Sequence, residues 1–256
     1  MLLAIDVGNT NCTFAVFHSN RIMGQWRLAT DPHRTADEYM IALMQLLALE
    51  SLSRDSITDC IISSVVPQTL FPLKCLSRNY FHCEPMVIGE APVHTGITIQ
   101  LEKPDEVGAD RLVNALAARK QFGGNVIIID FGTATTFDVV NSNGDYVGGV
   151  IAPGINLSMD ALKMAAAKLP EIAVAKPSRI IGKSTIGAMQ SGVYWGYVSL
   201  IEGIVMRIKQ EIGHDMKVIA TGGLAGLFSE ATPAIEHFEP NLTIEGLRII
   251  FEQNRK

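Results

Sequence analysis

Short apolar runs alternate with polar turns over the first 30 residues, a pattern typical of β-strands. The run 2–6 is apolar and ends in an acid, and the segments 12–17 and 22–28 follow as further strands of an antiparallel meander. Residues 35–49 then carry apolar positions at helical spacing, with Thr35 among the residues able to cap a helix. The chain is therefore predicted to begin with a small sheet followed by a helix.

The next hundred residues alternate between strand and helix patterns. Strands are predicted at 57–63 and 85–88, and helices from Pro67 towards Tyr80 and over 109–121. Residues 89–107 contain Pro92, Pro104 and Gly96 with little periodicity, so this segment is predicted to be a linker or a substrate loop.

The pattern of the first strands then returns. Residues 125–130 form another apolar run that ends in an acid, and the segments 134–140 and 146–151 follow as strands around Asn143-Gly144. A short strand over 217–221 comes later. The second half of the chain thus begins in the same way as the first.

Two aspartates mark this repetition. Asp130 comes 124 positions after Asp6, and both are followed by one apolar residue, a glycine and then hydroxyl or amide residues. We therefore predict an α/β protein of two similar halves, 1–115 and 116–256. Each half is expected to be a mixed sheet flanked by helices, with the two halves facing a central cleft.

The segment 186–208 is apolar enough to raise the question of a membrane span. Its apolar residues recur at helical spacing, and an adjacent stripe carries small residues at Gly192, Gly196, Ser199 and Gly203. Small residues let another helix approach closely. The pattern favours a buried helix at a domain or subunit interface over a membrane span.

Composition narrows the class of protein. The 256 residues are 48% hydrophobic, which is enough for a sizeable core, and carry a net charge of -5. Lys and Arg number 21 against 26 Asp and Glu, which argues against a broad nucleic-acid-binding surface. The 4 cysteines form no CxxC pair, and Asp6 interrupts the first apolar run too early for a signal peptide. Reduced thiols and a cytoplasmic location are expected.

The segment 6–13 has the features of a phosphate-binding turn. Gly8 lets the backbone approach an anion, the amides of residues 9–11 can donate, and Thr10 adds a hydroxyl. Asp6 would repel a phosphate unless it holds Mg²⁺ or its waters. An ordinary hairpin is the alternative, and the second copy at 130–136 favours the functional interpretation.

Two glycine-rich segments could also approach a ligand. Gly222-Gly223 follows the strand 217–221 and precedes a helix start at Leu224, which would place helix amides beside a nucleotide. A plain strand-to-helix connection is the alternative. The segment 148–154 has glycines around a proline, and a purely structural role is equally open there.

The residues Gly182-Lys183-Ser184-Thr185 look like the end of a P-loop. Pro177 stands where that pattern needs its first glycine, so the P-loop interpretation is rejected and Thr185 is kept only as a polar contact.

A charged pair opens the helix predicted after the linker. Asp110 could act as a base towards a substrate hydroxyl, and Arg111 beside it could grip a carboxylate or phosphate with two hydrogen bonds. A helix-capping carboxylate beside a solvated arginine is the alternative.

Taken together, these motifs resemble the type III pantothenate kinases, members of the acetate and sugar kinase, Hsc70 and actin superfamily, whose halves have a ribonuclease H-like fold. The resemblance covers essentially the whole chain. Its motifs are DVGNTNCT at 6–13, GADR at 108–111, DFGTATTFD at 130–138, GGVIAPG at 148–154 and TGG at 221–223. In this order and spacing the set is highly specific.

The resemblance implies an activity. The family transfers the γ-phosphate of ATP to the terminal hydroxyl of pantothenate, giving 4'-phosphopantothenate in the first committed step towards coenzyme A. It implies Mg²⁺ with ATP, a monovalent cation that is K⁺ or NH₄⁺, and a homodimer with no nucleic-acid or membrane partner.

The resemblance also implies residue roles. The ATP phosphates would be bound by Asp6 through Mg²⁺ and by Val7, Gly8, Asn9, Thr10, Asn11, Cys12 and Thr13. Thr133 would contact ATP, with Gly222 and Gly223 on the adenosine side. Asp110 would be the general base, and Asp130 would help to hold the monovalent cation. Pantothenate would be contacted by Gly108, Ala109, Asp110, Arg111 and, from the partner subunit, Thr185.

One position departs from the family pattern. Many members have a tyrosine seven positions before the glycine of GADR, near the substrate, and this chain has Leu101 there. The departure bears on the shape of the pantothenate pocket more than on the activity.

Three other functions stay open at this point. The chain could be another small-molecule kinase of the superfamily, a phosphatase of related fold, or a nucleotide-binding accessory factor in gene regulation. The presence of Asp6, Asp110 and Asp130 together argues for catalysis.

Overall fold

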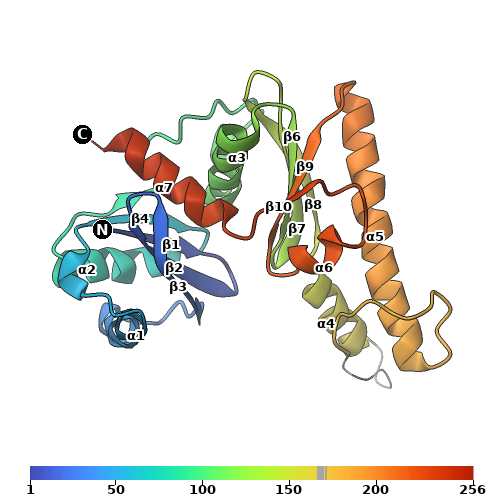
Figure 1. Ribbon diagram of the computed structural model, residues 1–256, viewed down its shortest axis with the longest axis horizontal. Helices are drawn as coiled ribbons and strands as arrows, with labels where there is room; N and C mark the ends of the chain where they lie inside the picture. Colours follow the sequence, from blue (N-terminus) through green and yellow to red (C-terminus); the bar gives the residue numbers. More distant parts are fainter. Residues whose placement is uncertain (166–169, 171, 256) are drawn as a thin grey trace. The chain divides into compact units, whose positions relative to one another are not determined.

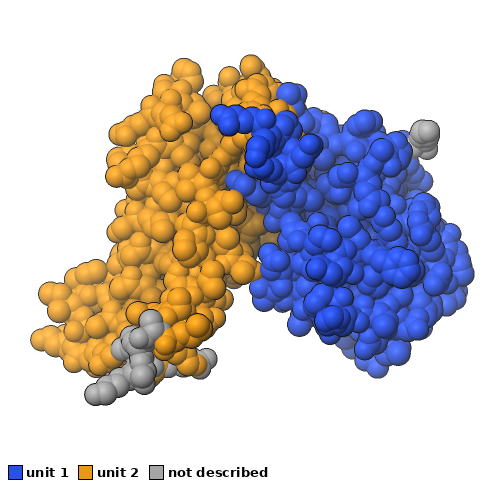
Figure 2. All heavy atoms as spheres, turned by 180° about the vertical axis from the view of Figure 1, so that it is seen from behind, with its two compact units in different colours: residues 1–98, 102–117, 241–256 blue, residues 99–101, 118–240 orange. Residues whose placement is uncertain are grey.

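The computed structural model describes residues 1–165, 170 and 172–255. They form two compact units, which Figure 2 shows in different colours. Unit 1 comprises residues 1–98, 102–117 and 241–256, and unit 2 comprises 99–101 and 118–240. The units are therefore not contiguous along the chain, because the C-terminal residues belong with the N-terminal sheet.

Unit 1 is built on a five-stranded mixed sheet. Its strands are β1 (Leu2–Val7), β2 (Asn11–His18), β3 (Arg21–Ala29), β4 (Asp59–Ser64) and β5 (Met86–Val87), in the order β3-β2-β1-β4-β5. The first three strands form the predicted antiparallel meander, while β4 runs parallel to β1 and β5 runs parallel to β4.

Helices cover both faces of this sheet (Figure 1). They are α1 (Ala36–Leu49), α2 (Leu70–Tyr80), α3 (Ala109–Phe122, its last turn in unit 2) and α7 (Leu242–Asn254), with short 3₁₀ turns at Arg54–Ser56, Pro67–Thr69 and Pro104–Glu106. Thr35 caps α1 in a reciprocal capping box with Glu38, a device that stabilises a helix start by about 1 kcal/mol.

The two faces of the sheet have separate cores, because side chains alternate along each strand. One core packs Leu3, Ile5 and Val7 of β1 against α1 and α2. The other packs Leu2 and Ala4 of β1 against α3 and α7. Asp6 continues the second set, so it points to the face that α3 covers.

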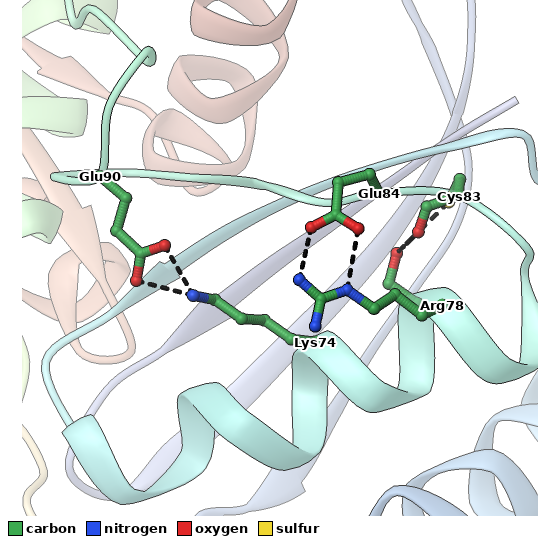
Figure 3. A network of polar contacts seen from close by, with 6 residues as sticks. Lys74, Arg78, Cys83, Glu84 and Glu90 are labelled. Atoms are coloured by element: carbon green, nitrogen blue, oxygen red, sulfur yellow. Dashed lines mark hydrogen bonds and ion pairs between the residues drawn. The ribbon is translucent and has the colours of Figure 1, made fainter.

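A polar network fastens α2 to the chain around β5 (Figure 3). Lys74 Nζ pairs with Glu90 at 2.6 Å, and the Arg78 guanidinium holds both oxygens of Glu84 at 2.5 and 2.8 Å. Because these pairs are largely exposed, each contributes little stability, on the order of 0.2–1 kcal/mol. The Lys74–Glu90 pair holds the start of the segment 89–107 against α2, and the Arg78–Glu84 pair holds the chain just before β5.

Unit 2 repeats the arrangement. Its strands are β6 (Val126–Phe131), β7 (Ala134–Val140), β8 (Tyr146–Pro153), β9 (Lys217–Gly222) and β10 (His237–Phe238), in the order β10-β9-β6-β7-β8. Its helices are α4 (Ile155–Ala165), α5 (Thr185–Ile212) and α6 (Ala225–Ser229). All three contribute to the core on one face of the sheet.

The two sheets have the same topology. In each, the central strand pairs antiparallel with the strand that follows it and parallel with a strand that returns after a helix. A third antiparallel strand lies at one edge and a second parallel strand at the other. The fold class predicted from the repeated aspartates, two similar α/β halves with mixed sheets, is confirmed.

Helix α5 is the segment that raised the question of a membrane span. Within the described residues, no helix is long and apolar enough to cross a membrane. The buried face of α5 includes Tyr194, Tyr197, Ile201 and Ile208. Ile186, which the sequence pattern placed on that face, is 49% exposed. The helix therefore packs on unit 2 along a narrower stripe than its apolar pattern predicts.

Candidate functional site

The first Asp-x-Gly motif forms the hairpin between β1 and β2. Its loop, residues 8–11 (turn 1), is closed by the Gly8 N–H, which donates to the Asn11 carbonyl at 2.9 Å. Thr30 braces the loop from the end of β3. Its amide donates to the Thr10 carbonyl at 2.9 Å, and its hydroxyl donates to the Gly8 carbonyl at 2.7 Å. Turn 1 is thus held rigidly while Asn9, Thr10 and Asn11 stay exposed.

The two residues that flank turn 1 point inwards. Val7 and Cys12 are opposite each other in the ladder, and their side chains are buried in the core. Burial, and then the charge of Asp6, raise the pKa of the Cys12 thiol, so it stays protonated. These two residues can offer a ligand their backbone only.

Asp6 lies in a row of oxygen-bearing side chains across the sheet. Its partners in register are Thr13 on β2 and Ser63 on β4. Side chains in register on adjacent strands point to the same face, so these three side chains bring their oxygens together at the end of β1. Thr30 and Ser63 did not emerge from the sequence analysis, because their position depends on how the strands pair.

Asp110 stands in the first turn of α3, on the same face of the sheet as Asp6. Val113, one turn further along α3, packs in the core beside Ala4 and Ile61. The backbone of Gly108 approaches Val65, just beyond the end of β4. The structure therefore brings Asp110 to the edge of the sheet where β1 and β4 end.

Two local contacts fix the Asp110 carboxylate. Its Oδ1 accepts a hydrogen bond from the Arg111 N–H at 2.8 Å. A Cβ atom added to Gly108 would lie 2.5 Å from the same oxygen, so only glycine leaves room for this rotamer. Burial raises the pKa of Asp110, against the lowering effect of the Arg111 amide and charge. A carboxylate that binds its proton more tightly than usual suits a general base.

The second Asp-x-Gly motif forms the hairpin between β6 and β7, with residues 132–134 as its loop (turn 2). The Gly132 N–H donates to the Ala134 carbonyl at 3.0 Å. Gly154 supports the loop from the end of β8. Its amide donates to the Thr133 carbonyl at 3.1 Å, and a Cβ there would lie 2.1 Å from that oxygen. The glycine of the 148–154 motif is therefore needed to let the chain approach turn 2.

Asp130 occupies the position in unit 2 that Asp6 occupies in unit 1. Its partners in register are Thr136 on β7 and Thr221 on β9, again two hydroxyl residues. Gly222 has a φ of +94°, and a Cβ there would lie 2.5 Å from Asp130 Oδ1. In each unit a glycine thus leaves space beside one of the candidate carboxylates, Gly108 beside Asp110 and Gly222 beside Asp130. The two turns differ by one residue, since turn 2 is shorter.

The remaining predicted residues lie elsewhere in unit 2. Thr185 is exposed at the start of α5, directly after the capping Ser184. Leu101 is half-buried, and its Cδ2 lies 3.5 Å from where a Cβ of Gly148 would stand. Gly223 donates its amide to the Phe131 carbonyl at 3.2 Å, so the Gly-Gly turn packs against the end of β6.

The donor set fits hard cations. Among the described residues, no group of three or more His, Cys, Asp or Glu side chains could hold a metal by itself. Each aspartate instead lies beside two hydroxyl residues at the end of a strand. Oxygen ligands of this kind suit Mg²⁺, which is usually bound by one or two carboxylates together with substrate phosphates and water.

The duplicated sheets, each with an Asp-x-Gly hairpin at its centre, define the class: the actin-like ATPase fold shared by acetate and sugar kinases. Solved structures agree at this level. A Campylobacter jejuni protein suggested to be a Baf family transcriptional activator matches with a TM-score of 0.62 and 16% identity, over 98% of both chains. The Lmo2764 protein from Listeria monocytogenes, a suggested N-acetylmannosamine kinase, matches with a TM-score of 0.54 and 12% identity, over 100% of this chain and 99% of that one.

Sequence relatives give the family. Residues 2–207 match the profile of type III pantothenate kinase. The type III pantothenate kinase of Paramagnetospirillum magneticum is 58% identical over 254 residues, 99% of this chain and 98% of the relative. The type III pantothenate kinase of Rhodospirillum rubrum is 58% identical over 255 residues, which are 100% of this chain and 99% of the relative. The chain belongs to the type III pantothenate kinase family, an ATP-dependent kinase family.

Proposed function

We infer that the chain transfers the γ-phosphate of ATP to the terminal hydroxyl of pantothenate, forming 4'-phosphopantothenate. Asp110 carries the proposal. It is a half-buried carboxylate with a raised pKa, held at the first turn of α3 within the segment 2–207 that matches the family profile. This is the group that an alcohol-phosphorylating kinase needs beside the acceptor hydroxyl.

Turn 1 binds the phosphates of ATP in this proposal. The exposed residues 9–11 offer amides and hydroxyls without a bulky side chain at Gly8, and Thr30 holds them in place. Asp6, with Thr13 and Ser63 beside it, holds the waters of Mg²⁺. The bound Mg²⁺ neutralises charge on the phosphates as the terminal phosphoryl group is transferred.

Asp110 orients the pantothenate hydroxyl and accepts its proton as the new oxygen–phosphorus bond forms and the bond to ADP breaks. In a loose transition state this proton leaves late, so positioning matters as much as basicity. Gly108 and Ala109 shape the pantothenate site, and Arg111 meets the carboxylate of pantothenate.

In unit 2, Asp130 contributes to a site for K⁺ or NH₄⁺, together with the hydroxyls of Thr136 and Thr221. Thr133 in turn 2 contacts ATP, and Gly222-Gly223 lies on the adenosine side. The exposed turn and its neighbouring oxygens support these assignments.

We assign the active form as a homodimer in which Thr185 contacts pantothenate from the partner subunit. Gly192, Gly196 and Ser199 are exposed on α5, and no atom lies within 4 Å of a Cβ at either glycine. Ile186 is 49% exposed near the start of the same helix. An open stripe of small residues flanked by apolar side chains is suited to close packing with a second helix.

A coupled assay tests the activity. With pantothenate, ATP, Mg²⁺ and K⁺ present, we expect ADP release that stops when any one of the four is omitted. Replacing K⁺ by Na⁺ should also abolish it, and NH₄⁺ should restore it. A flat response to the cation exchange would remove Asp130 from its role.

A panel of sugars and small acids in the same assay separates the other kinase functions from this one. Nucleotide binding without phosphorylation of any acceptor would instead favour an accessory protein. ATP hydrolysis that is independent of pantothenate would favour a phosphatase.

A further inference from the structure

We propose that Asp138 and Tyr146 form a buried positioning pair that couples the pantothenate-side segment 99–101 to the cation site at Asp130. The proposal rests on the function inferred above, and it assigns a role to two residues that this function does not use. All the contacts that carry it lie within unit 2.

Asp138 is a fully buried carboxylate, with 0% exposure, on strand β7. It accepts hydrogen bonds from the Tyr146 hydroxyl at 2.7 Å and from the Thr136 hydroxyl at 3.1 Å, one on each oxygen. A buried carboxylate is costly unless such bonds satisfy it, and charge-assisted bonds of this kind are strong. Asp138 therefore fixes the orientation of both hydroxyl groups.

The hydrogen bond between Thr136 and Asp138 orients the Thr136 hydroxyl beside the proposed cation site. Thr136 lies directly opposite Asp130 in the β6–β7 ladder. Because its hydroxyl hydrogen is directed to Asp138, the lone pairs of the Thr136 oxygen are left to face other groups. Lone pairs beside a carboxylate are what a hard monovalent cation requires. Asp138 thus selects the hydroxyl orientation that lets Thr136 act as a ligand.

The hydrogen bond between Tyr146 and Asp138 fixes the residue that contacts the segment 99–101. The Tyr146 carbonyl accepts the Gln100 N–H at 2.8 Å, and Ile99 forms an isolated parallel bridge with Tyr146. The Gln100 side chain donates to Asp145 at 2.7 Å. Leu101 then lies against Gly148. The position of 99–101 therefore depends on Tyr146, whose ring is fixed by Asp138.

The expected consequence is a coupling between two ligands. A cation that binds at Asp130 and Thr136 stiffens the row of hydrogen bonds through Asp138 and Tyr146, and so stabilises the binding-ready form of 99–101. Linkage requires the reverse effect to be equal, so pantothenate should tighten cation binding by the same factor.

Tyr146→Phe removes the hydroxyl and keeps the ring. In the wild-type enzyme, the half-saturating K⁺ concentration should fall as pantothenate rises. In Tyr146→Phe, the KM for pantothenate should rise about 10-fold, the scale of ordinary allosteric couplings, while kcat changes little. The half-saturating K⁺ concentration of this variant should no longer change with the pantothenate concentration. Asp138→Asn should in addition raise the half-saturating K⁺ concentration, since it disturbs both hydroxyls.

Tyr80→Phe is the matched control. Tyr80 also donates its hydroxyl to an aspartate, Asp37, but this bond joins α1 and α2 in unit 1. It should leave the KM for pantothenate and the response to K⁺ unchanged. Equal effects of Tyr80→Phe and Tyr146→Phe would show a general loss of stability and would overturn the proposal.

Amide hydrogen exchange gives a readout that does not need turnover. Exchange of the peptide around Gln100 should slow when Na⁺ is replaced by K⁺ in the wild-type protein, and should be fast in both salts in Tyr146→Phe. Unchanged exchange in Tyr146→Phe overturns the link. Should that variant fail to fold, Asp138→Asn, which changes the acceptor of the Tyr146 hydroxyl and keeps the size of the side chain, gives the same comparison. An enzyme that shows the exchange effect but phosphorylates no pantothenate would refute the proposed function and leave the coupling standing.

Discussion

At the scale of single residues, each of the two proposed carboxylates, Asp110 and Asp130, has a glycine beside it, and a larger residue there would occupy the space that the carboxylate needs. A Cβ atom added to Gly108 would lie 2.5 Å from Asp110 Oδ1, and a Cβ atom added to Gly222 would lie 2.5 Å from Asp130 Oδ1. Glycine is usually explained by backbone freedom, and Gly222, with its φ of +94°, does need that freedom. Gly108 is required for the space beside the carboxylate.

Asp110→Asn should lower turnover by ~10²–10⁴-fold while ATP still binds, because the amide cannot accept the hydroxyl proton. In the wild-type enzyme, the acid limb of the kcat/KM profile should lie above the ordinary aspartate pKa, since burial raises the pKa of Asp110. Near-normal turnover of the variant would remove Asp110 from its role.

The same substitution has a stability signature. A raised pKa in the folded state means that the folded chain binds the proton more tightly than the unfolded chain does, so this group costs stability as pH rises through the two pKa values. Asp110→Asn should therefore increase the free energy of unfolding at pH 7, and the gain should shrink as acid protonates the wild-type carboxyl. Urea unfolding at several pH values measures it.

Gly108→Ala tests the space beside Asp110. The added Cβ should displace the carboxylate and lower kcat by about 10²-fold, the scale expected for a misplacement near 1 Å. Gly226→Ala is the control, because a Cβ there meets only Phe238 at 3.6 Å, an ordinary contact. Equal turnover in both variants would contradict the steric account.

At the scale of elements, the strands, the turns and the antiparallel meander followed from local pattern, while the parallel pairs and the register did not. The strand β7, predicted over 134–140, has those bounds in the structure, and α1 begins after Thr35 as its capping pattern indicated. Alternation, caps and turn glycines are encoded within a few residues. The roles of Thr30, Ser63 and Thr136 were not predictable, because they depend on which strands pair and in which register.

Gly222→Ala should weaken the junction between β9 and β6. A Cβ there would lie 2.7 Å from the Phe131 amide nitrogen, and the φ of +94° disfavours alanine as well. We expect a loss of about 1–3 kcal/mol in the free energy of unfolding, the usual cost of overpacking. Gly223→Ala, where no atom lies within 4 Å of the new Cβ, should be close to neutral by the same urea titration.

At the scale of the whole molecule, the repeated motif predicted the duplicated architecture, and the topology of the two sheets agrees strand by strand. The sequence did not predict α7. The pattern of an amphipathic helix indicates which of its faces is buried, but not which sheet that face covers, so the packing of α7 on the first sheet could not be predicted.

Gly196→Arg tests the dimer. The position is exposed with open space around it, and arginine is a better helix former than glycine, so the subunit fold should tolerate the change. We expect sedimentation to show a monomer, with activity lost because Thr185 no longer reaches the partner. Gln210→Arg, also exposed on α5, should remain dimeric. A dimeric Gly196→Arg would exclude this face as the interface.

The packing of α7 in unit 1 also sets an order of events during synthesis. Leu247, Ile250 and Phe251 complete the core that contains Leu2 and Ala4, so the strand β1 is covered by a helix that is made only after the whole of unit 2. Domains usually fold in the order in which they are made. Here unit 2 can assemble first, while the face of the earlier sheet that α3 and α7 share stays only partly covered. Nascent chains stalled before residue 242 should therefore engage a chaperone through their N-terminal strands.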